Sequence, residues 1–319
     1  MKNILKKGMI LILTIMFCFC FSSCKKNKTE IILPENISLT ENESEVELKV
    51  YDINLKSIIN MKLEEYVQGV LAGEMFNNWP LEALKAQAVL ARTYTLYFLQ
   101  NLTSKYDGAD ISNDITEAQA YDSSKINENI KQAVAETKGL VAVCDDELIE
   151  AWFHSNSGGK TTKASFGLNY LGEEKYTQIK DSPETETNSQ NYKWVQTFTK
   201  SDILSALRTM GVNVTTISSF EIGQSDDSGR ALTFNVGGTE FSASTFRLKI
   251  GSTKFKSTLI TNITVSKTGV MFTGYGYGHG VGMSQWGAKI MAEEGKNYKD
   301  IIEYYFDNVE IKESKYVIE

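Results

Sequence analysis

The feature that constrains this chain most is a glycine-rich segment near its C-terminus, "GYGYGHGVGMSQWG". Glycine occupies every second position from Gly274 to Gly282, and Tyr275, Tyr277 and His279 stand between the glycines. Alternating glycines let a backbone come close to a ligand or to another part of the chain. In an extended segment the two tyrosines and His279 would project to the same side. Such a surface suits sugar rings, although a tightly packed glycine bend explains the segment equally well. A dinucleotide-binding loop is not indicated, because the preceding βαβ context is missing.

The rest of the chain mixes strand and helix patterns without a regular βα rhythm, which favours the α+β class. Residues 46–50 alternate apolar and polar side chains, as in a half-buried strand. A long helix is predicted from Pro80 to Asn101, because proline suits the first position of a helix. The 319 residues predict one large domain or two closely joined ones. The formal net charge of −7 argues against a nucleic-acid partner.

The N-terminal segment is predicted to lie outside the fold. Three lysines precede Met9–Phe21, an apolar run of 13 residues. That run is shorter than the roughly 20 residues a spanning helix needs, and it suits the core of a signal peptide. The following "FSSCKK" resembles a bacterial lipoprotein signal, which implies lipidation of Cys24. An uncleaved signal anchor is the alternative.

These observations divide the chain into a signal peptide (1–23), a tether (24–44) and a folded domain (45–319). The domain is expected to be extracytoplasmic and anchored to a bacterial membrane. Cys144 would be the one cysteine left besides the lipidated one, so no intrachain disulfide is expected. It lies in the apolar run "LVAVC" and is predicted to be a core residue.

The two histidines of the chain lie in loops rich in glycine or serine. His154 is in "FHSNSGGK", and His279 is in the glycine-rich segment. Ser155 and Ser157 could suggest a serine hydrolase, but no G-x-S-x-G turn is present. Zinc needs three or four ligands from Cys, His and acids, and two histidines with one apolar cysteine make a weak set. No metal and no cofactor is therefore expected.

Glu74 is the remaining candidate for chemistry, because it is a single acid among large apolar residues in "LAGEMFNNWP". Two explanations stay open from the residues alone. Glu74 could be solvated or paired with Lys85 or Arg92. Alternatively, its apolar neighbours raise its pKa, since desolvation disfavours the charged form of an acid. A protonated glutamic acid is what a glycosidic leaving oxygen requires.

Several long segments together resemble the stage II sporulation protein D family and its LytB-type amidase-enhancer relatives. They are "LEEYVQGVLAGEM…PLEALKAQAVLARTY", "FHSNSGGKT…FG", "DSPE…W" and "GYGHGVGMSQWGAKIMAEEGKNYKDIIEYYF". The resemblance covers most of the chain from about Val46 to Ile311. It implies a peptidoglycan lytic transglycosylase with two lobes around a glycan-binding groove. Such an enzyme cleaves the bond between N-acetylmuramic acid (MurNAc) and N-acetylglucosamine (GlcNAc) and leaves a 1,6-anhydro ring.

The resemblance also assigns roles. The catalytic glutamate of the family falls on Glu74, and one acid suffices when the substrate's own 6-hydroxyl replaces water. Substrate-binding candidates are Lys85, Arg92, His154, Ser155, Tyr275, Tyr277, His279 and Gln285.

Some relatives carry zinc on a histidine that matches His154, followed by cysteines at six-residue steps. Here those steps fall on Lys160 and Phe166, so the metal site is expected to be absent. The implied partners are peptide-stripped glycan strands and a cell-wall amidase. The alternative function is a non-catalytic, wall-binding enhancer of an N-acetylmuramoyl-L-alanine amidase. The lipoprotein-like start differs from the spanning anchor expected of the sporulation protein itself, which leaves a role in sporulation engulfment open.

Overall fold

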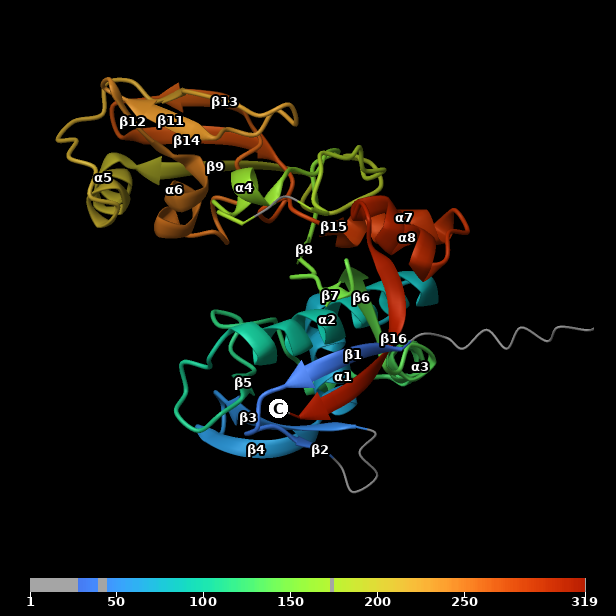
Figure 1. The fold of residues 1–319 in the computed structure, drawn as a ribbon. Helices are drawn as coiled ribbons and strands as arrows, with labels where there is room; N and C mark the ends of the chain where they lie inside the picture. The colour runs from blue at the N-terminus through green and yellow to red at the C-terminus, as the bar shows by residue number, and fades with distance from the viewer. Residues whose placement is uncertain (1–27, 40–44, 173–174, 319) are drawn as a thin grey trace, which may run out of the picture.

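The computed structural model describes residues 28–39, 45–172 and 175–318. It contains both helices and strands, which confirms the α+β class. Figure 1 shows two lobes, and each has its own buried hydrophobic cluster. The signal peptide and Cys24 lie outside the described residues.

The first lobe contains the N-terminal half of the chain and its C-terminal elements. Its strands are β1 (Thr29–Leu33), β2 (Ser38–Leu39), β3 (Val46–Asp52), β4 (Ser57–Lys62), β5 (Ile111–Ser112), β6 (Leu140–Cys144), β7 (Glu147–Leu148) and β16 (Glu310–Ile318). Its helices are α1 (Leu63–Glu74), α2 (Leu81–Asn101), η1 (Ser123–Lys125), α3 (Glu128–Glu136), α7 (Gln285–Glu293) and α8 (Tyr298–Tyr305).

The second lobe is formed by β9 (Lys193–Thr199), α5 (Lys200–Thr209), β10 (Glu221–Ile222), β11 (Thr233–Val236), β12 (Thr239–Ser242), α6 (Ala243–Ile250), β13 (Ile260–Val265) and β14 (Gly269–Tyr275). Two short strands, β8 (Phe153–His154) and β15 (Met283–Ser284), lie between the lobes, and the short helix α4 (Ala164–Gly167) lies beside the second lobe.

Helix α2 is the central element of the first lobe. It contacts α1, α3, α7, α8 and β6, so most of its circumference is buried. Small side chains on several of its faces, among them Ala83, Ala88 and Ala91, let the neighbouring helices approach closely. The predicted helix is present and ends at Asn101 as expected, but it begins at Leu81, one residue after the predicted start, because Pro80 takes the N-cap position. Cys144 is buried at the end of β6, as expected.

The N-terminal strands correct the predicted tether. Strand β1 pairs in parallel with β16 along its whole length and forms the edge of the sheet β1-β16-β6-β7. Ile31, Leu33 and Ile37 are buried in the first core. The segment from Thr29 therefore belongs to the fold, and the tether prediction for 24–44 is wrong from that residue to Leu39. The short run "TEIIL", with its β-branched residues, was the missed signal.

The core of the second lobe consists mainly of phenylalanine side chains. The sheets β13-β14-β9 and β10-β11-β12 pack around it together with α5 and α6. Phe234 and Phe272 are fully buried and contact several other rings at edge-to-face or tilted angles. This arrangement is the favoured geometry for aromatic pairs.

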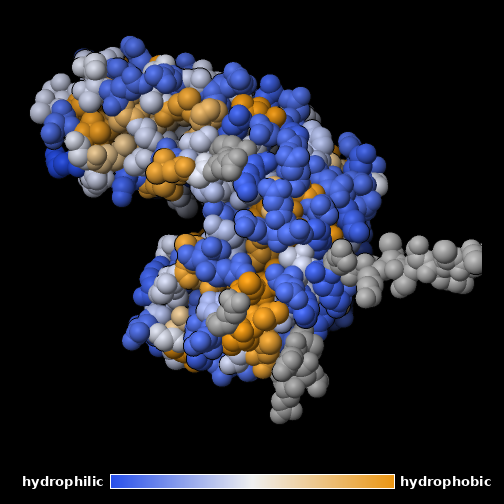
Figure 2. Space-filling view, in the orientation of Figure 1, coloured by the Kyte–Doolittle hydropathy of each residue, from blue (hydrophilic) through white to orange (hydrophobic). Residues whose placement is uncertain are grey.

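Figure 2 shows a deep hollow between the two lobes on the face that it displays. That this hollow binds a glycan stays a prediction. Within the described ranges, no helix is long and apolar enough to cross a membrane.

Candidate active site

Glu74 is the last residue of α1, and two glycines of that helix determine what packs against it. A Cβ atom on Gly73 would lie 2.7 Å from the backbone nitrogen of Tyr121, and one on Gly69 would collide with the Tyr121 ring. Glycine inside a helix usually costs about 1 kcal/mol relative to alanine. Here the missing side chain of Gly73 lets the Ala120–Tyr121 backbone pack directly against α1. The chain from β5 to η1 is thereby brought next to Glu74.

The Glu74 carboxyl is half-buried and accepts two hydrogen bonds. Its Oε1 accepts from the backbone N–H of Ala120 at 2.7 Å, and its Oε2 accepts from Gln285 Nε2 at 3.2 Å. Burial raises the pKa of Glu74, and the two hydrogen bonds, from Ala120 and Gln285, oppose that rise. The direction agrees with the prediction of a tuned acid. Gln285, predicted to bind substrate, instead holds the acid.

Lys85 and Arg92 do not pair with Glu74. The Arg92 side chain is 0% exposed and forms a two-pronged ion pair with Glu64, at 2.9 and 2.6 Å. Lys85 binds Glu82 at 2.8 Å and Glu136 at 2.5 Å. The prediction that Arg92 contacts substrate or orients Glu74 is therefore wrong, because the Arg92 guanidinium is buried and paired with Glu64. The ion pairs of Lys85 likewise direct its ammonium toward α3.

Three aromatic rings lie beside the acid. Trp79 and Trp286 are each 8% exposed and meet at a ring-centroid distance of 4.9 Å. Met75 is buried as well, so Met75 and Trp79 fit the predicted role of apolar neighbours. Phe76 differs, because 52% of it is exposed. It contacts both tryptophans, with centroid distances of 5.3 and 6.5 Å.

The N-terminus of α7 connects Glu74 to the histidine loop. Ser284 caps this helix, and β15 pairs in parallel with β8, which places Ser284 opposite His154. The backbone N–H of Trp286 donates to the Ser155 carbonyl oxygen at 3.1 Å. The structure therefore brings Glu74, Gln285 and Ser155 into one neighbourhood from three distant parts of the sequence.

The two histidines pack against each other, with ring centroids 5.6 Å apart. His154 Nδ1 bonds to the Val281 carbonyl oxygen at 3.0 Å, and His279 Nδ1 accepts from the Val281 N–H at 3.1 Å. Burial is the main cause that lowers the pKa of both rings, to about 3 for His279. The guanidinium groups of Arg230 and Arg247 add to this effect. Both imidazoles are therefore neutral at physiological pH.

The two tyrosines of the glycine-rich segment pack against different neighbours. The segment leaves β14 after Tyr275, and the alternate glycines from Gly276 to Gly282 have positive φ angles, so it is looped rather than extended. Tyr275 contacts the Tyr192 ring, and Lys256 lies over the Tyr277 ring at 5.3 Å. The same-side expectation assumed an extended segment, and the structure contradicts that assumption.

A second carboxylate links three separate segments of the chain, and sequence reasoning gave it no role. Glu184 is 1% exposed, and its Oε1 accepts from the Ser157 N–H at 2.7 Å, from the Ser157 hydroxyl at 2.5 Å and from the Ser284 hydroxyl at 2.6 Å. The Ser182 hydroxyl donates to its other oxygen. The glutamate of "DSPE" was visible in the sequence. Its three serine partners come from different segments of the chain, so sequence spacing could not predict that they would meet.

Metal ligands do not gather in the part of the chain that the structure describes. No group of three or more His, Cys, Asp or Glu residues there could hold an ion. Metal analysis of the purified protein tests the prediction that this chain requires no metal.

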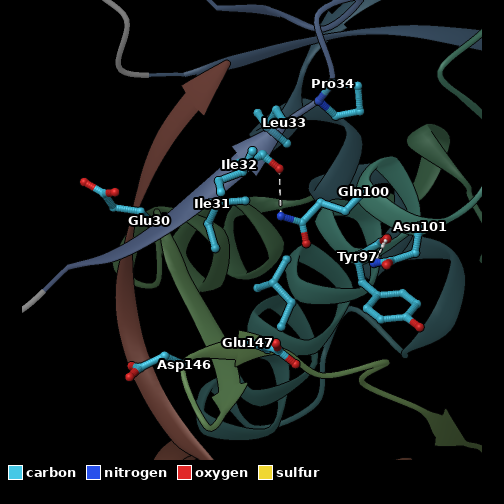
Figure 3. A pocket seen from close by; sticks show the side chains of 11 residues that line it. Glu30, Ile31, Ile32, Leu33, Pro34, Tyr97, Gln100, Asn101, Asp146 and Glu147 are labelled. Atoms are coloured by element: carbon cyan, nitrogen blue, oxygen red, sulfur yellow. Dashed lines mark hydrogen bonds between the residues drawn. The ribbon is translucent and has the colours of Figure 1, made fainter. Parts of the chain in front are cut away.

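A cavity of ≈ 670 Å³ lies away from Glu74, between β1 and the C-terminal turns of α2 (Figure 3). Gln100 donates to the Ile32 carbonyl oxygen at 2.7 Å across it. This contact fastens the edge strand to the helix. None of the predicted site residues lines this cavity.

Comparison with known proteins adds the relatives of this chain. Residues 51–143 match the family model described as "Stage II sporulation protein", and residues 161–282 match a domain of unknown function (DUF8618). An uncharacterized protein of Brachyspira hyodysenteriae is 34% identical over 274 residues, which are 82% of this chain and 69% of that protein. Stage II sporulation protein D of Bacillus subtilis is 31% identical over 85% of this chain and 80% of its own length. The Amidase enhancer of Bacillus subtilis is 31% identical over 75% of this chain and 39% of its own length.

Proposed function

Because this chain belongs to the stage II sporulation protein D family, we propose that it is a peptidoglycan lytic transglycosylase in which Glu74 is the catalytic residue. The observation that carries the proposal is the setting of Glu74. Its carboxyl has a raised pKa, two neutral hydrogen-bond donors and, among the described residues, no cationic partner. Those are the properties of an acid that gives up its proton during a reaction.

The two Glu74 oxygens have different roles in this proposal. Oε1 is held by the Ala120 N–H at 2.7 Å, so it acts as an acceptor. The transferable proton therefore resides on Oε2, which lies at the longer distance of 3.2 Å from Gln285. An Oε2–H group can donate to the glycosidic oxygen while its lone pair still accepts from the amide.

In the first step Glu74 gives its proton to the oxygen that links C1 of MurNAc to C4 of GlcNAc. The C1–O bond breaks, its electron pair stays on the oxygen, and GlcNAc leaves with a free 4-hydroxyl. The MurNAc ring passes through an oxocarbenium-like state, and Glu74 becomes a carboxylate.

In the second step the 6-hydroxyl of the same MurNAc attacks C1 and forms the 1,6-anhydro bond. Glu74 takes the proton from that hydroxyl and returns to its starting form. No water is consumed, so a second carboxylate to activate water is not required. Hydrolytic glycosidases usually need that second group.

The proposed setting rests on the sequence motifs and on the relatives. The substrate class is peptidoglycan glycan strands, with stem peptides already removed by a cell-wall amidase. The mature protein is held outside the cytoplasm by a lipid on Cys24. The relatives named for sporulation and for amidase enhancement support cell-wall remodelling as the process.

The second candidate is a wall-binding enhancer of an amidase that has little catalysis of its own. The similarity to an amidase enhancer favours it. It predicts wall binding and amidase stimulation that do not depend on Glu74.

One experiment separates the two candidates. The soluble domain is incubated with amidase-stripped glycan strands, and the ends are analysed by mass spectrometry. We expect 1,6-anhydro ends from the wild type and none from Glu74→Gln, while Glu128→Gln, an exposed change on α3, behaves as wild type. No anhydro ends from the wild type, or equal amounts from Glu74→Gln, would refute the catalytic proposal.

A further inference from the structure

The exposed ring of Phe76 has no structural explanation in the fold. Its two aromatic neighbours are almost completely buried, whereas 52% of Phe76 remains open to solvent. It stands two residues after Glu74, beyond the end of α1. A large apolar side chain at such a position contributes little to the core and exposes apolar surface to water.

The position of Phe76 is nevertheless well defined. Its ring lies 5.3 Å from the Trp79 ring at an interplanar angle of 41°, and 6.5 Å from the Trp286 ring at 64°. The backbone N–H of Trp79 also donates to the Phe76 carbonyl oxygen at 3.1 Å. Phe76 is therefore supported from behind by two buried rings and by a turn.

The same helix positions the ring and the acid. Gln285 holds the Glu74 carboxyl, and the next residue, Trp286, supports Phe76. Lys289 lies over the Trp286 ring at 5.5 Å, which further covers that tryptophan. Of the three rings in this cluster, Phe76 is the one that a ligand can reach.

We propose that Phe76 is a sugar-binding platform, on which a pyranose ring of the glycan stacks next to the bond that Glu74 cleaves. A pyranose has one face of C–H groups that packs on an aromatic ring, while its hydroxyls remain available for hydrogen bonds. Aromatic side chains combined with a few polar groups are typical of such sites. The inference rests on the proposed function for its substrate, and it assigns Phe76 to binding rather than to shielding Glu74.

Binding is tested in a Glu74→Gln background, so that the strands are not consumed. Affinity for amidase-stripped glycan strands is measured by calorimetry, and tryptophan emission reports on Trp79 and Trp286. Adding Phe76→Ala should weaken binding about tenfold and abolish the emission change, as expected for loss of one stacking contact. Phe76→Trp should retain binding, because it keeps a flat face.

The control is Leu248→Ala, which removes an exposed apolar side chain, 64% accessible, from α6 in the other lobe. It should bind as the parent does. All variants should unfold at the parental temperature, because Phe76 is not a core residue. Equal affinity of the Phe76→Ala and parental proteins would overturn the platform.

The outcomes also separate this inference from the proposed function. If the wild type forms no anhydro ends but its binding to the strands depends on Phe76, the catalytic proposal fails and the platform stands. If anhydro ends form and Phe76→Ala leaves both KM and affinity unchanged, catalysis stands and the platform fails.

Discussion

Glu74 and Glu184 are both shielded from solvent, but they differ in the number of hydrogen bonds that they accept. This difference distinguishes the proposed catalytic acid from an acid that holds parts of the chain together. Glu184 is fully buried and accepts hydrogen bonds from three serine side chains and one backbone N–H. Glu74 is half-buried and accepts two hydrogen bonds, one of them long. A carboxylate that accepts several hydrogen bonds from buried donors is held in one place, because moving it would leave those donors without an acceptor. A carboxyl with few donors in an apolar setting can bind and release a proton.

The largest expected effect is on catalysis by Glu74→Gln. General acid–base catalysis contributes typically 10²–10⁴-fold, so we expect a loss of anhydro-product formation of about 1,000-fold. Rates on stripped glycan strands measure it. The fold should be retained, since glutamine can still accept from the Ala120 N–H.

The same substitution should also change the pH dependence of stability. The folded-state pKa of Glu74 is raised, so the folded protein binds more protons than the unfolded chain between the ordinary and the raised pKa. Stability contributed by this group is present at low pH and decreases as pH rises through that window. Glu74→Gln should therefore unfold at higher denaturant concentration than wild type above the window. A lower midpoint there would contradict the assignment of a destabilised carboxylate.

Replacement of Glu184 should affect stability rather than chemistry directly. Glu184→Ala leaves buried serine hydroxyls and a backbone N–H without their acceptor, at a cost of about 3 kcal/mol in the free energy of unfolding. Urea unfolding measures this cost. Glu186→Ala is the control, because Glu186 is exposed and forms one weak ion pair, at 3.8 Å from Lys193. If Glu184→Ala were as stable as the control, other contacts would hold the segments of Ser157, Ser182 and Ser284 together.

A smaller effect is expected from Gly73→Ala. The added methyl would lie 2.7 Å from the Tyr121 nitrogen and 2.8 Å from the Ala120 carbonyl carbon, so the Ala120 segment must shift. Activity should fall about tenfold, because misplaced catalytic groups lose rate steeply. The matched control is Gly211→Ala, where a Cβ meets nothing within 4 Å. It has a positive φ angle, so a modest stability loss without an activity loss is expected there.

The smallest effect concerns Gln285→Leu, which removes one of the two donors to Glu74. The Gln285 amide opposes the rise in the Glu74 pKa, so its loss should raise that pKa further. Activity requires the protonated acid, and the alkaline limb of the kcat/KM profile should move to higher pH. A shift to lower pH would show that Gln285 does not act on the protonation of Glu74.

Sequence reasoning predicted the parts of this account that depend on local chemistry. The α+β class, the presence of α2 and the burial of Cys144 follow from periodicity and composition. The raised pKa of Glu74 was predictable because Met75 and Trp79 are its neighbours in the chain. Each of these depends on residues close together in sequence.

The rest depends on contacts between distant segments. Arg92 could not be excluded from the site until its pairing with Glu64, 28 positions away, was visible. The Ala120 N–H is a backbone donor and has no sequence signature. The exposure of Phe76 could not be predicted for the same reason, because only the fold determines which of three adjacent rings faces solvent.

The central claim is that one carboxyl group cleaves the glycan without water, and an isotope experiment tests it most directly. Stripped glycan strands are cleaved in H₂¹⁸O, and the masses of the products with new MurNAc ends are measured by mass spectrometry. The account predicts 1,6-anhydro ends that carry no ¹⁸O and are lighter by one water than reducing ends. Reducing MurNAc ends labelled with ¹⁸O would show that water attacks C1, and would contradict catalysis by Glu74 alone.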